Sequence, residues 1–366
     1  MLLCSCMADD TKYLLALNRH PFLGAKRLLA LKKAYGDWRR VWGSTEKERE
    51  SNVEDKTAKA VSEARTRYSP EHELEIISKL NINVIELGDV NYPTALKEVS
   101  DPPALLYYKG SLDALSGKVV AVVGSRSATQ YGYRATEDIF LPIARLGVTI
   151  VSGLALGIDT VAHRVALDGG GKTVAVLGCG MDQIYPASNT GLARAIVEKG
   201  GALISEFAPG LPSYRSNFPQ RNRIIAALAQ LTVVVEGLAE SGALITARAA
   251  LEYNKEVGAV PGDINRPQSA GPLNLIKMGA LPVTCADDVA LALGLVPPKS
   301  VPVSEEGIKM TSGEKTVYNV LSHEPEHIDK IVSCANLNIA QVNSSLTMLE
   351  IKGLVKNLGG NLFVRR

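Results

Sequence analysis

Six short apolar runs alternate with helix-like stretches through the middle of the chain. Each run is rich in Val, Ile, Leu or Ala and gives way to glycine or a polar residue. The runs are Val119–Gly124, Thr149–Gly153, Thr173–Gly178, Ala202–Glu206, Leu231–Gly237 and Glu256–Gly262. Near-continuous apolar strands separated by helices indicate a parallel sheet that is covered on both faces. We therefore predict a doubly wound, mostly parallel, Rossmann-like α/β domain over residues 68–296.

The first part of the chain has a helical pattern. Apolar positions predict helices over Tyr13–Leu17 and Ala25–Tyr35, and the turn between them contains Gly24. Two helices joined by a short turn with glycine are typical of a helix-hairpin-helix or SAM-like domain, which we predict for residues 1–67. The highly charged stretch Glu46–Arg67 is expected to form an exposed helix or a loosely held arm.

The last part of the chain predicts a separate small domain. Residues 297–310 are rich in proline and are expected to form a linker. Beyond it, the pattern predicts three helices and then a hairpin: Thr311–His323, His327–Asn336, Ile339–Lys352 and Leu354–Arg366. This is the winged-helix order, so we predict a winged-helix domain over residues 311–366. Its six basic and five acidic side chains favour structural support or protein contact over the reading of duplex DNA.

Composition narrows the class of protein. The chain has 366 residues, 46% of them hydrophobic, which excludes general disorder. Its longest apolar runs are far shorter than the ~20 residues of a membrane helix, and the start MLLCSC lacks the features of a signal peptide. The five cysteines form neither a disulfide framework nor a C-x-x-C metal pair. We expect a cytoplasmic protein with no membrane insertion and no metal site.

The overall charge neither requires nor excludes a polyanionic partner. Lys and Arg number 40 against 38 Asp and Glu, which gives a net charge of +2. Any nucleic-acid site must therefore be a local patch. Ten of the 15 basic residues in 118–296 are Arg, whose planar fork suits bidentate phosphate contacts and stacking on bases.

Loops at the carboxyl ends of the predicted strands carry the candidate chemistry, because ligands bind there in such sheets. The first strand ends in Gly124, Ser125 and Arg126, and the second ends in Ser152 and Gly153. A glycine turn that enters a helix presents unpaired N–H groups and the positive end of the helix dipole to an anion. Both loops are candidate phosphate sites. The alternative is an ordinary strand–helix turn with a serine cap.

The loop after the fourth strand is the most unusual. Phe218 is followed by Arg221, Asn222 and Arg223 at the start of a predicted helix. The chain has only five phenylalanines, and one placed beside two arginines at a helix start fits base stacking with flanking phosphate contacts. The structural alternative is that Phe218 is a hydrophobic staple at the helix start.

Five further residues in or after these loops are weaker candidates for a functional role. Ser241 is a candidate helix N-cap, and Gly242 permits a close approach of the backbone; we include both as candidate contacts of a nucleic acid. Asp159 and His163 share a helix face, but no third metal ligand accompanies them. We therefore favour an Asp stabilised by the helix dipole and a packed His. Cys179 has no adjacent base and is expected to be a packed residue.

Taken together, these stretches resemble the DNA processing protein A family (DprA, also called Smf). The motifs are VGSRSATQYG at 123–132, SGLALGIDTVAH at 152–163, AVLGCGMDQIYPASN at 175–189, LISEFAPG at 203–210, FPQRNRIIAAL at 218–228, SGALITARAALE at 241–252 and AVPGDIN at 259–265. The resemblance is dense over residues 70–297. A SAM-like N-terminal domain and a winged-helix C-terminal domain both occur in this family.

The resemblance implies a protein without enzymatic activity and without a cofactor. Such a protein would bind and protect incoming single-stranded DNA, dimerise, and load the RecA recombinase onto the DNA during natural transformation. The pocket residues of the family fall on Ser125, Arg126, Phe218, Arg221 and Asn222 of this chain.

The alternative function is a nucleotide-processing hydrolase on the same scaffold, like the lysine-decarboxylase-like (LOG) phosphoribohydrolases. Those enzymes rely on a P-G-G-x-G-T loop and a catalytic glutamate. The comparable stretch here, VEGLAESG at 235–242, lacks that pattern. The sequence also shows no Ser-His-Asp order, metal triad or Walker loop. We therefore predict no catalytic residues.

Overall fold

The computed structural model describes residues 10–211, 214–297, 310–322 and 324–365. The chain divides into two compact units, Met1–Lys299 and Ser300–Arg366. The MLLCSC start and most of the predicted linker, residues 298–309, lie outside the described residues. In the described part of the chain, no helix is both long enough and apolar enough to cross a membrane.

The first unit is built on a nine-stranded sheet with the order β1-β2-β6-β5-β4-β3-β7-β8-β9. The six predicted strands are confirmed: β3 (Val119–Val123), β4 (Thr149–Ser152), β5 (Thr173–Leu177), β6 (Ala202–Ser205), β7 (Leu231–Val234) and β8 (Glu256–Ala259). Neighbours among these six strands pair in parallel, and β9 (Leu281–Pro282) joins β8 in the same direction. The predicted doubly wound α/β fold is therefore confirmed.

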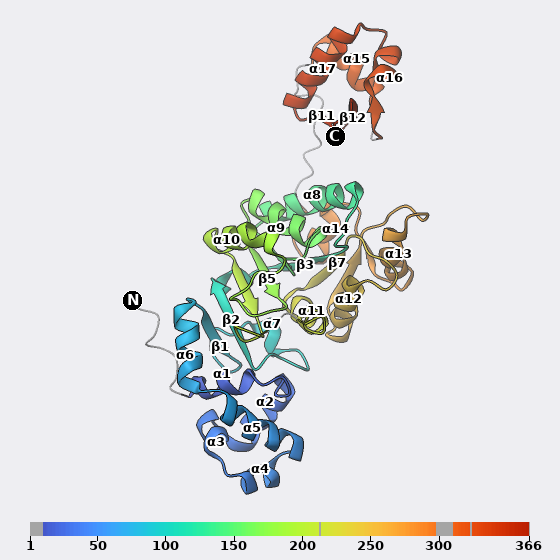
Figure 1. Ribbon diagram of the computed structural model, residues 1–366. Coiled ribbons are helices and arrows are strands. Elements are labelled where there is room, and N and C mark those ends of the chain that lie inside the picture. Colours follow the sequence, from blue (N-terminus) through green and yellow to red (C-terminus); the bar gives the residue numbers. More distant parts are fainter. Residues whose placement is uncertain (1–9, 212–213, 298–309, 323, 366) are drawn as a thin grey trace. The chain divides into compact units, whose positions relative to one another are not determined.

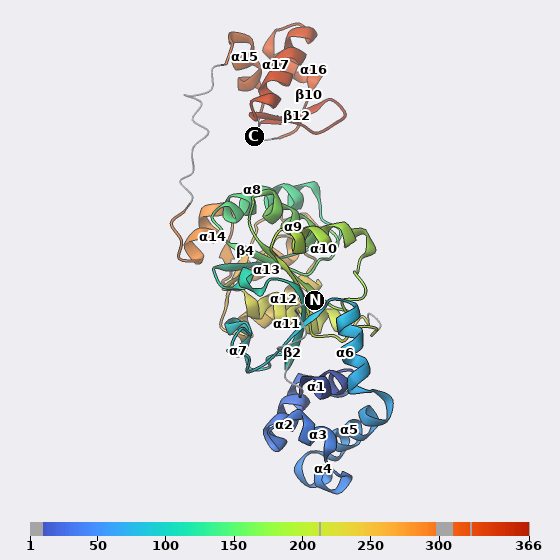
Figure 2. The same ribbon diagram turned by 90° about the vertical axis from the view of Figure 1, so that its left-hand side faces the viewer.

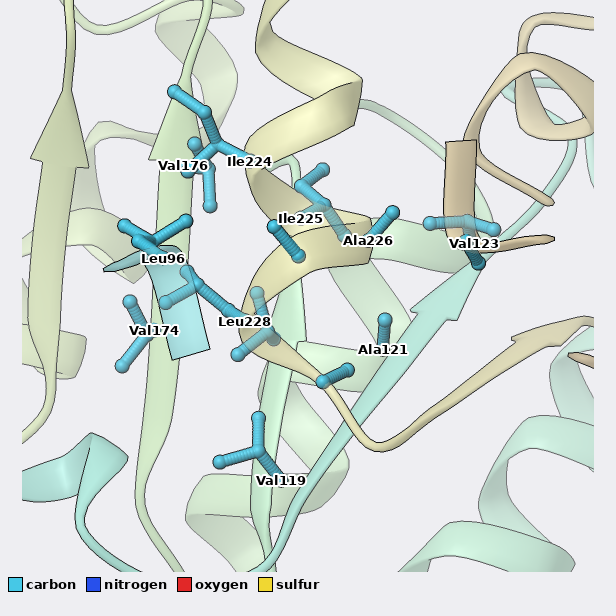
Figure 3. Packing of buried hydrophobic residues seen from close by; sticks show 14 of the residues in the cluster. Leu96, Val119, Ala121, Val123, Val174, Val176, Ile224, Ile225, Ala226 and Leu228 are labelled. Carbon is cyan, nitrogen blue, oxygen red and sulfur yellow. The ribbon is translucent and has the colours of Figure 1, made fainter. Parts of the chain in front are cut away.

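Helices cover both faces of the sheet (Figures 1 and 2). One face carries α8 (Gln130–Arg145), α9 (Ile158–Asp168), α10 (Thr190–Glu198) and α14 (Ala286–Ala292); the other carries α7 (Thr94–Lys97), α11 (Asn217–Leu228), α12 (Gly242–Glu252) and α13 (Ala270–Lys277). Alternate residues of a strand point to opposite faces. Val119, Ala121 and Val123 accordingly pack with Ile225 and Leu228 of α11 (Figure 3), whereas Val120 and Val122 pack against α8 and α9.

The strand order creates a crevice beside β3. The chain builds β3, β4, β5 and β6 in one direction across the sheet and then returns to place β7 on the other side of β3. Loops that leave β3 and β7 in opposite directions separate at their carboxyl ends, which is where doubly wound sheets bind ligands. The edge strands β1 (Asn83–Glu86) and β2 (Leu105–Gly110) extend the sheet in antiparallel fashion beyond β6.

The N-terminal segment is a cluster of helices: α1 (Thr11–Asn18), α2 (Ala25–Tyr35), α3 (Trp38–Gly43), α4 (Glu46–Asn52), α5 (Asp55–Arg67) and α6 (Pro70–Lys79). The prediction of an exposed helix or a loosely held arm over Glu46–Arg67 is right for α4, most of which is exposed, but wrong for α5. The stretch forms α4 and α5, and Ala58, Val61 and Ala64 of α5 are buried. Alanines on one face of a charged helix allow that face to pack against the rest of the protein. They are only weakly hydrophobic, so the apolar pattern in the sequence does not reveal this face.

The helical segment shares a core with the sheet. Leu14 and Leu17 of α1 belong to the same buried cluster as Leu105 and Tyr107 of β2. The helical segment and the sheet belong to the same compact unit. The boundary at residue 67 therefore stays a prediction.

The second unit has the winged-helix architecture that the sequence predicts. Three helices, α15 (Ser312–Val320), α16 (Ile328–Ala335) and α17 (Ile339–Ile351), pack with a three-stranded sheet of order β10-β12-β11. Its strands are β10 (Glu326–His327), β11 (Val355–Asn357) and β12 (Leu362–Arg365). Val317, Ile331, Leu346 and Phe363 belong to its buried core.

We predict that Arg19 stabilises the helical segment by linking the end of α1 to α6 and to the loop after β6. Its guanidinium donates to the buried carboxylate of Glu73 at 3.0 Å and to the carbonyl oxygen of Pro209 at 3.0 Å. Arg19→Ala leaves that carboxylate without its cation and should lower the free energy of unfolding by about 2 kcal/mol. The measurement is urea-induced unfolding of the full chain.

Lys79→Ala is the matched control, because Lys79 forms an exposed pair with Glu75 on α6 and should cost less than about 0.5 kcal/mol. If Arg19→Ala cost no more than Lys79→Ala, the Arg19–Glu73 pair would not stabilise the helical segment.

Candidate functional site

An open cavity of about 700 Å³ lies at the carboxyl ends of the central strands. Its walls come from the loop after β3, the start of α9 and the first turns of α11 and α12. Residues around it include Ser125, Arg126, Arg215, Phe218, Asn222 and Ile245. The crevice predicted from strand order therefore contains residues from both sides of the sheet.

The loop after β3 packs on the start of α9 and leaves Arg126 exposed to solvent. Gly124 packs on Ile158, where an added Cβ would lie 2.6 Å from the side-chain Cγ1. Thr129 caps α8 by accepting from the Gly132 N–H, and its own N–H donates to the buried Glu236 carboxylate at 2.8 Å. The Ser125 hydroxyl accepts from the Ser127 N–H at 3.1 Å within the loop. Arg126 is exposed.

The second predicted phosphate loop does not present its serine to the cavity. Ser152 is fully buried, and its hydroxyl donates to the carbonyl oxygen of Val122 at 2.7 Å. It therefore links β4 to β3. The Asp159 carboxylate accepts from the N–H groups of Gly153 and Ala155 at 3.1 and 3.4 Å and closes the loop. Burial raises the pKa of Asp159 although the charge of Arg221 opposes the rise.

His163 and Cys179 have packing roles. Burial, and then the charge of Arg221, lower the pKa of His163 to about 3, so its ring is neutral at physiological pH and lies against the Thr173 hydroxyl at 2.7 Å. Burial raises the pKa of the Cys179 thiol, which donates to the Gln183 carbonyl oxygen at 3.3 Å. In the part of the chain that the structure describes, no three His, Cys, Asp or Glu side chains are grouped so that they could hold a metal ion.

Arg221 lies in the site but is buried. Its side chain is 4% exposed, and Nη1 donates to the carbonyl oxygens of Gly153 and Val176 at the ends of β4 and β5. An added Cβ at Gly153 would lie 2.3 Å from that nitrogen, so a larger residue there would displace the guanidinium. Burial lowers the pKa of Arg221 to about 10, which leaves it charged at neutral pH. Its Nε also donates to Asn222 Oδ1 at 3.1 Å.

The start of α12 forms the opposite wall. Asn222 Nδ2 donates to the carbonyl oxygen of Gly242 at 3.1 Å and ties α11 to α12. Gly242 is exposed, with open space where a side chain would be. Ser241 occupies the N-cap position of α12, but its hydroxyl makes no capping hydrogen bond. That hydroxyl oxygen is buried and has no hydrogen-bond partner among the described residues.

Arg223 is directed away from this cavity. Its Nη2 donates to both carboxylate oxygens of Glu206 at 2.6 Å, and its Nη1 donates to the carbonyl oxygen of Asp101. It lines a separate cavity of about 470 Å³ beside the helical segment. Burial opposes the charge of Arg223, but the carboxylates of Glu206 and Asp101 outweigh it and raise its pKa. The sequence grouped Arg223 with Phe218 and Arg221; in the structure its guanidinium points to the other cavity.

An aromatic pair lies beside Arg126. The Arg126 guanidinium stands over the half-buried ring of Phe218, 5.2 Å from its centroid. The ring of Tyr185 lies 5.8 Å from that of Phe218, at an angle of 49°. Sequence reasoning missed Tyr185 and Arg215 as cavity residues. The only signal for Tyr185 was its place after the third apolar run, and Arg215 lies in the loop before Phe218. An exposed cation beside aromatic rings suits a ligand with phosphates and flat bases.

Comparisons with known proteins match both units. The family model described as DNA recombination-mediator protein A matches residues 83–294, and that described as the DprA winged helix domain matches residues 302–361. Protein Smf of Escherichia coli K12 is 36% identical over 356 residues, 93% of this chain and 95% of the relative. DNA processing protein DprA of Bacillus subtilis is 41% identical over 209 residues, 57% of this chain and 70% of the relative.

Two solved structures are similar to this chain in fold and sequence. DNA processing protein A from Streptococcus pneumoniae superposes with a TM-score of 0.66 at 35% identity, covering 76% of this chain and 97% of that one. DNA processing protein A from Helicobacter pylori, whose structure is described for its single-stranded DNA binding mode, has a TM-score of 0.53 at 29% identity, covering 58% of this chain and 95% of that one. The fold, the motifs and these matches agree: the chain belongs to the DNA processing protein A family, DprA/Smf.

Proposed function

We propose that this protein binds single-stranded DNA in the cavity beside β3 and acts as a recombination mediator. The observation that carries the proposal is an exposed arginine, Arg126, next to the rings of Phe218 and Tyr185 in an open cavity at the strand ends. The Helicobacter pylori relative, described by its single-stranded DNA binding mode, supports the choice of ligand.

The chemistry of the cavity favours unpaired over paired strands. An aromatic ring stacks on a base only when the base is free of its partner, and stacking tolerates every base. Arg126 and Arg215 supply positive charge for the phosphates of the DNA backbone. Ser125, Asn222 and Gly242 are their polar neighbours in the cavity. Arg221 contributes its charge from beneath the cavity. Ser152 is fully buried and Arg223 is committed to Glu206, so we leave these two out of the proposed contacts.

We propose binding rather than catalysis at this site. Two side chains that could carry acid–base or nucleophilic chemistry hold loops instead: Asp159 accepts from two main-chain N–H groups, and Cys179 donates to a carbonyl oxygen. The cellular role that follows is delivery of single-stranded DNA to the RecA recombinase during natural transformation, by a cytoplasmic homodimer. The description of the matching family as a recombination mediator supports this role.

The test of the proposed function is the choice between single and double strands. We expect oligo(dT) and mixed-sequence single strands to bind with similar affinity, and a matched duplex to bind at least about tenfold more weakly at physiological salt. Fluorescence anisotropy with labelled oligonucleotides measures all three. Equal affinity for the duplex would contradict the proposal.

The salt dependence of binding should report the phosphate contact of Arg126. Arg126→Ala should weaken binding to every single-stranded sequence alike and flatten the slope of log affinity against log salt by about 0.7. Arg145→Ala is the control, because Arg145 is exposed at the far end of α8. An unchanged slope for Arg126→Ala would place the phosphate path elsewhere.

Arg221→Ala should behave differently from Arg126→Ala. Because its guanidinium is bound to main-chain carbonyl oxygens, its loss should first appear as a fall of about 3 kcal/mol in the free energy of unfolding, measured by urea titration.

The winged-helix unit should be dispensable for single-strand binding. All the proposed contacts lie before residue 297, and the chain divides at Lys299. A chain that ends at Pro298 should therefore bind oligo(dT) within about threefold of the full chain. A loss of more than about tenfold in a truncated chain with a normal circular dichroism spectrum would assign part of the site to the second unit.

A further inference from the structure

We propose that Tyr185 is a base-stacking platform of the site, and that Phe218 supports it. The inference rests on the proposed function and deepens it by naming where an unpaired base lies. Tyr185 belongs to the loop between β5 and α10, from which sequence analysis had singled out no DNA contact. Its ring faces that of Phe218 with centroids 5.8 Å apart, and the residue is 54% exposed.

Phe218 is the less accessible of the two rings. Its edge lies so close to Gly178 that an added Cβ there would be 2.9 Å from the ring Cδ1. The Arg126 guanidinium stands over the same ring at 5.2 Å. Gly178 therefore covers an edge of the Phe218 ring and the Arg126 guanidinium covers part of its face, so less of this ring is accessible to a ligand. Phe218 is half-buried as a result, whereas more than half of Tyr185 is open to solvent.

A small recess lies beside Tyr185. It has a volume of about 50 Å³ and is lined by Leu156, Tyr185, Pro186 and Phe218, with Arg126 and Arg221 beside them. Leu156 is 48% exposed, so the recess is flanked by two exposed side chains with apolar surface. A flat base stacked on Tyr185 covers this surface while its phosphate remains within the field of the two arginines.

The test compares a normal strand with one that has no bases. Oligo(dT) and a sugar–phosphate strand of equal length with abasic sites throughout are titrated against the wild-type protein and Tyr185→Ala. We expect Tyr185→Ala to weaken oligo(dT) binding about tenfold, and to leave binding of the abasic strand unchanged. Tyr185→Phe keeps the ring and should bind oligo(dT) as the wild-type protein does.

Two further variants separate stacking from folding. Tyr214→Ala removes another exposed tyrosine, which lines the separate cavity beside the helical segment, and should bind oligo(dT) normally. Phe218→Ala should weaken binding and also lower the melting temperature, because its ring packs on Gly178. Tyr185→Ala should lower the affinity without lowering the melting temperature.

The outcomes distinguish this inference from the proposed function. If Tyr185→Ala bound oligo(dT) within twofold of the wild-type protein, or lost affinity equally for the abasic strand, Tyr185 would not be a stacking platform. In either case the proposed function would still stand on wild-type binding and on Arg126→Ala. If the wild-type protein failed to bind oligo(dT), the proposed function itself would fall.

Discussion

The site depends on one buried charge, the guanidinium of Arg221. A charge taken out of water costs several kcal/mol unless the groups around it compensate. Here the carbonyl oxygens of Gly153 and Val176 accept its hydrogen bonds, and the carboxylate of Asp159 lies close enough to raise the pKa of the guanidinium against the effect of burial. Meeting these requirements fixes the ends of β4 and β5, the start of α9 and the first turn of α11 relative to one another.

Fixing α11 in this way decides what its neighbouring side chains can do. An α-helix turns by about 100° per residue, so residues two apart point in nearly opposite directions. Arg221 lies under the cavity, and Arg223 consequently faces Glu206 and Asp101 on the other side. Asn222, between them, reaches Gly242 and holds α12 in place. The three consecutive residues 221–223 thus have three different roles. The first joins the strand ends under the site, the second links α11 to α12, and the third lines a second cavity.

Sequence pattern predicted the elements of the fold better than the contents of the site. Strands buried on both faces are continuous apolar runs, so β3 to β8 were predicted with ends correct to within three residues. The alanine-lined face of α5 gave no such signal, because its sequence is dominated by charge. Within the site, the type of a residue indicated which contacts its side chain could make, but not whether that side chain is accessible to a ligand. Ser152 and Arg223 have suitable side chains, yet the hydroxyl of one is fully buried and the guanidinium of the other is paired with Glu206. Tyr185 could not be singled out from sequence, because its contact with Phe218 joins two segments that are distant along the chain and meet only in the fold.

A nearly neutral protein can bind a polyanion if recognition does not depend chiefly on charge. The chain carries a net charge of only +2, and one of the arginines at the cavity is buried. In the proposed function few phosphates are neutralised, and stacking, which is available only to unpaired bases, supplies the rest of the affinity. In the proposed function, the arginines therefore provide attraction to any backbone, whereas the aromatic pair provides the preference for single strands. The two kinds of group come from β3, β5 and α11, whose ends meet at the crevice that the reversal of strand order creates.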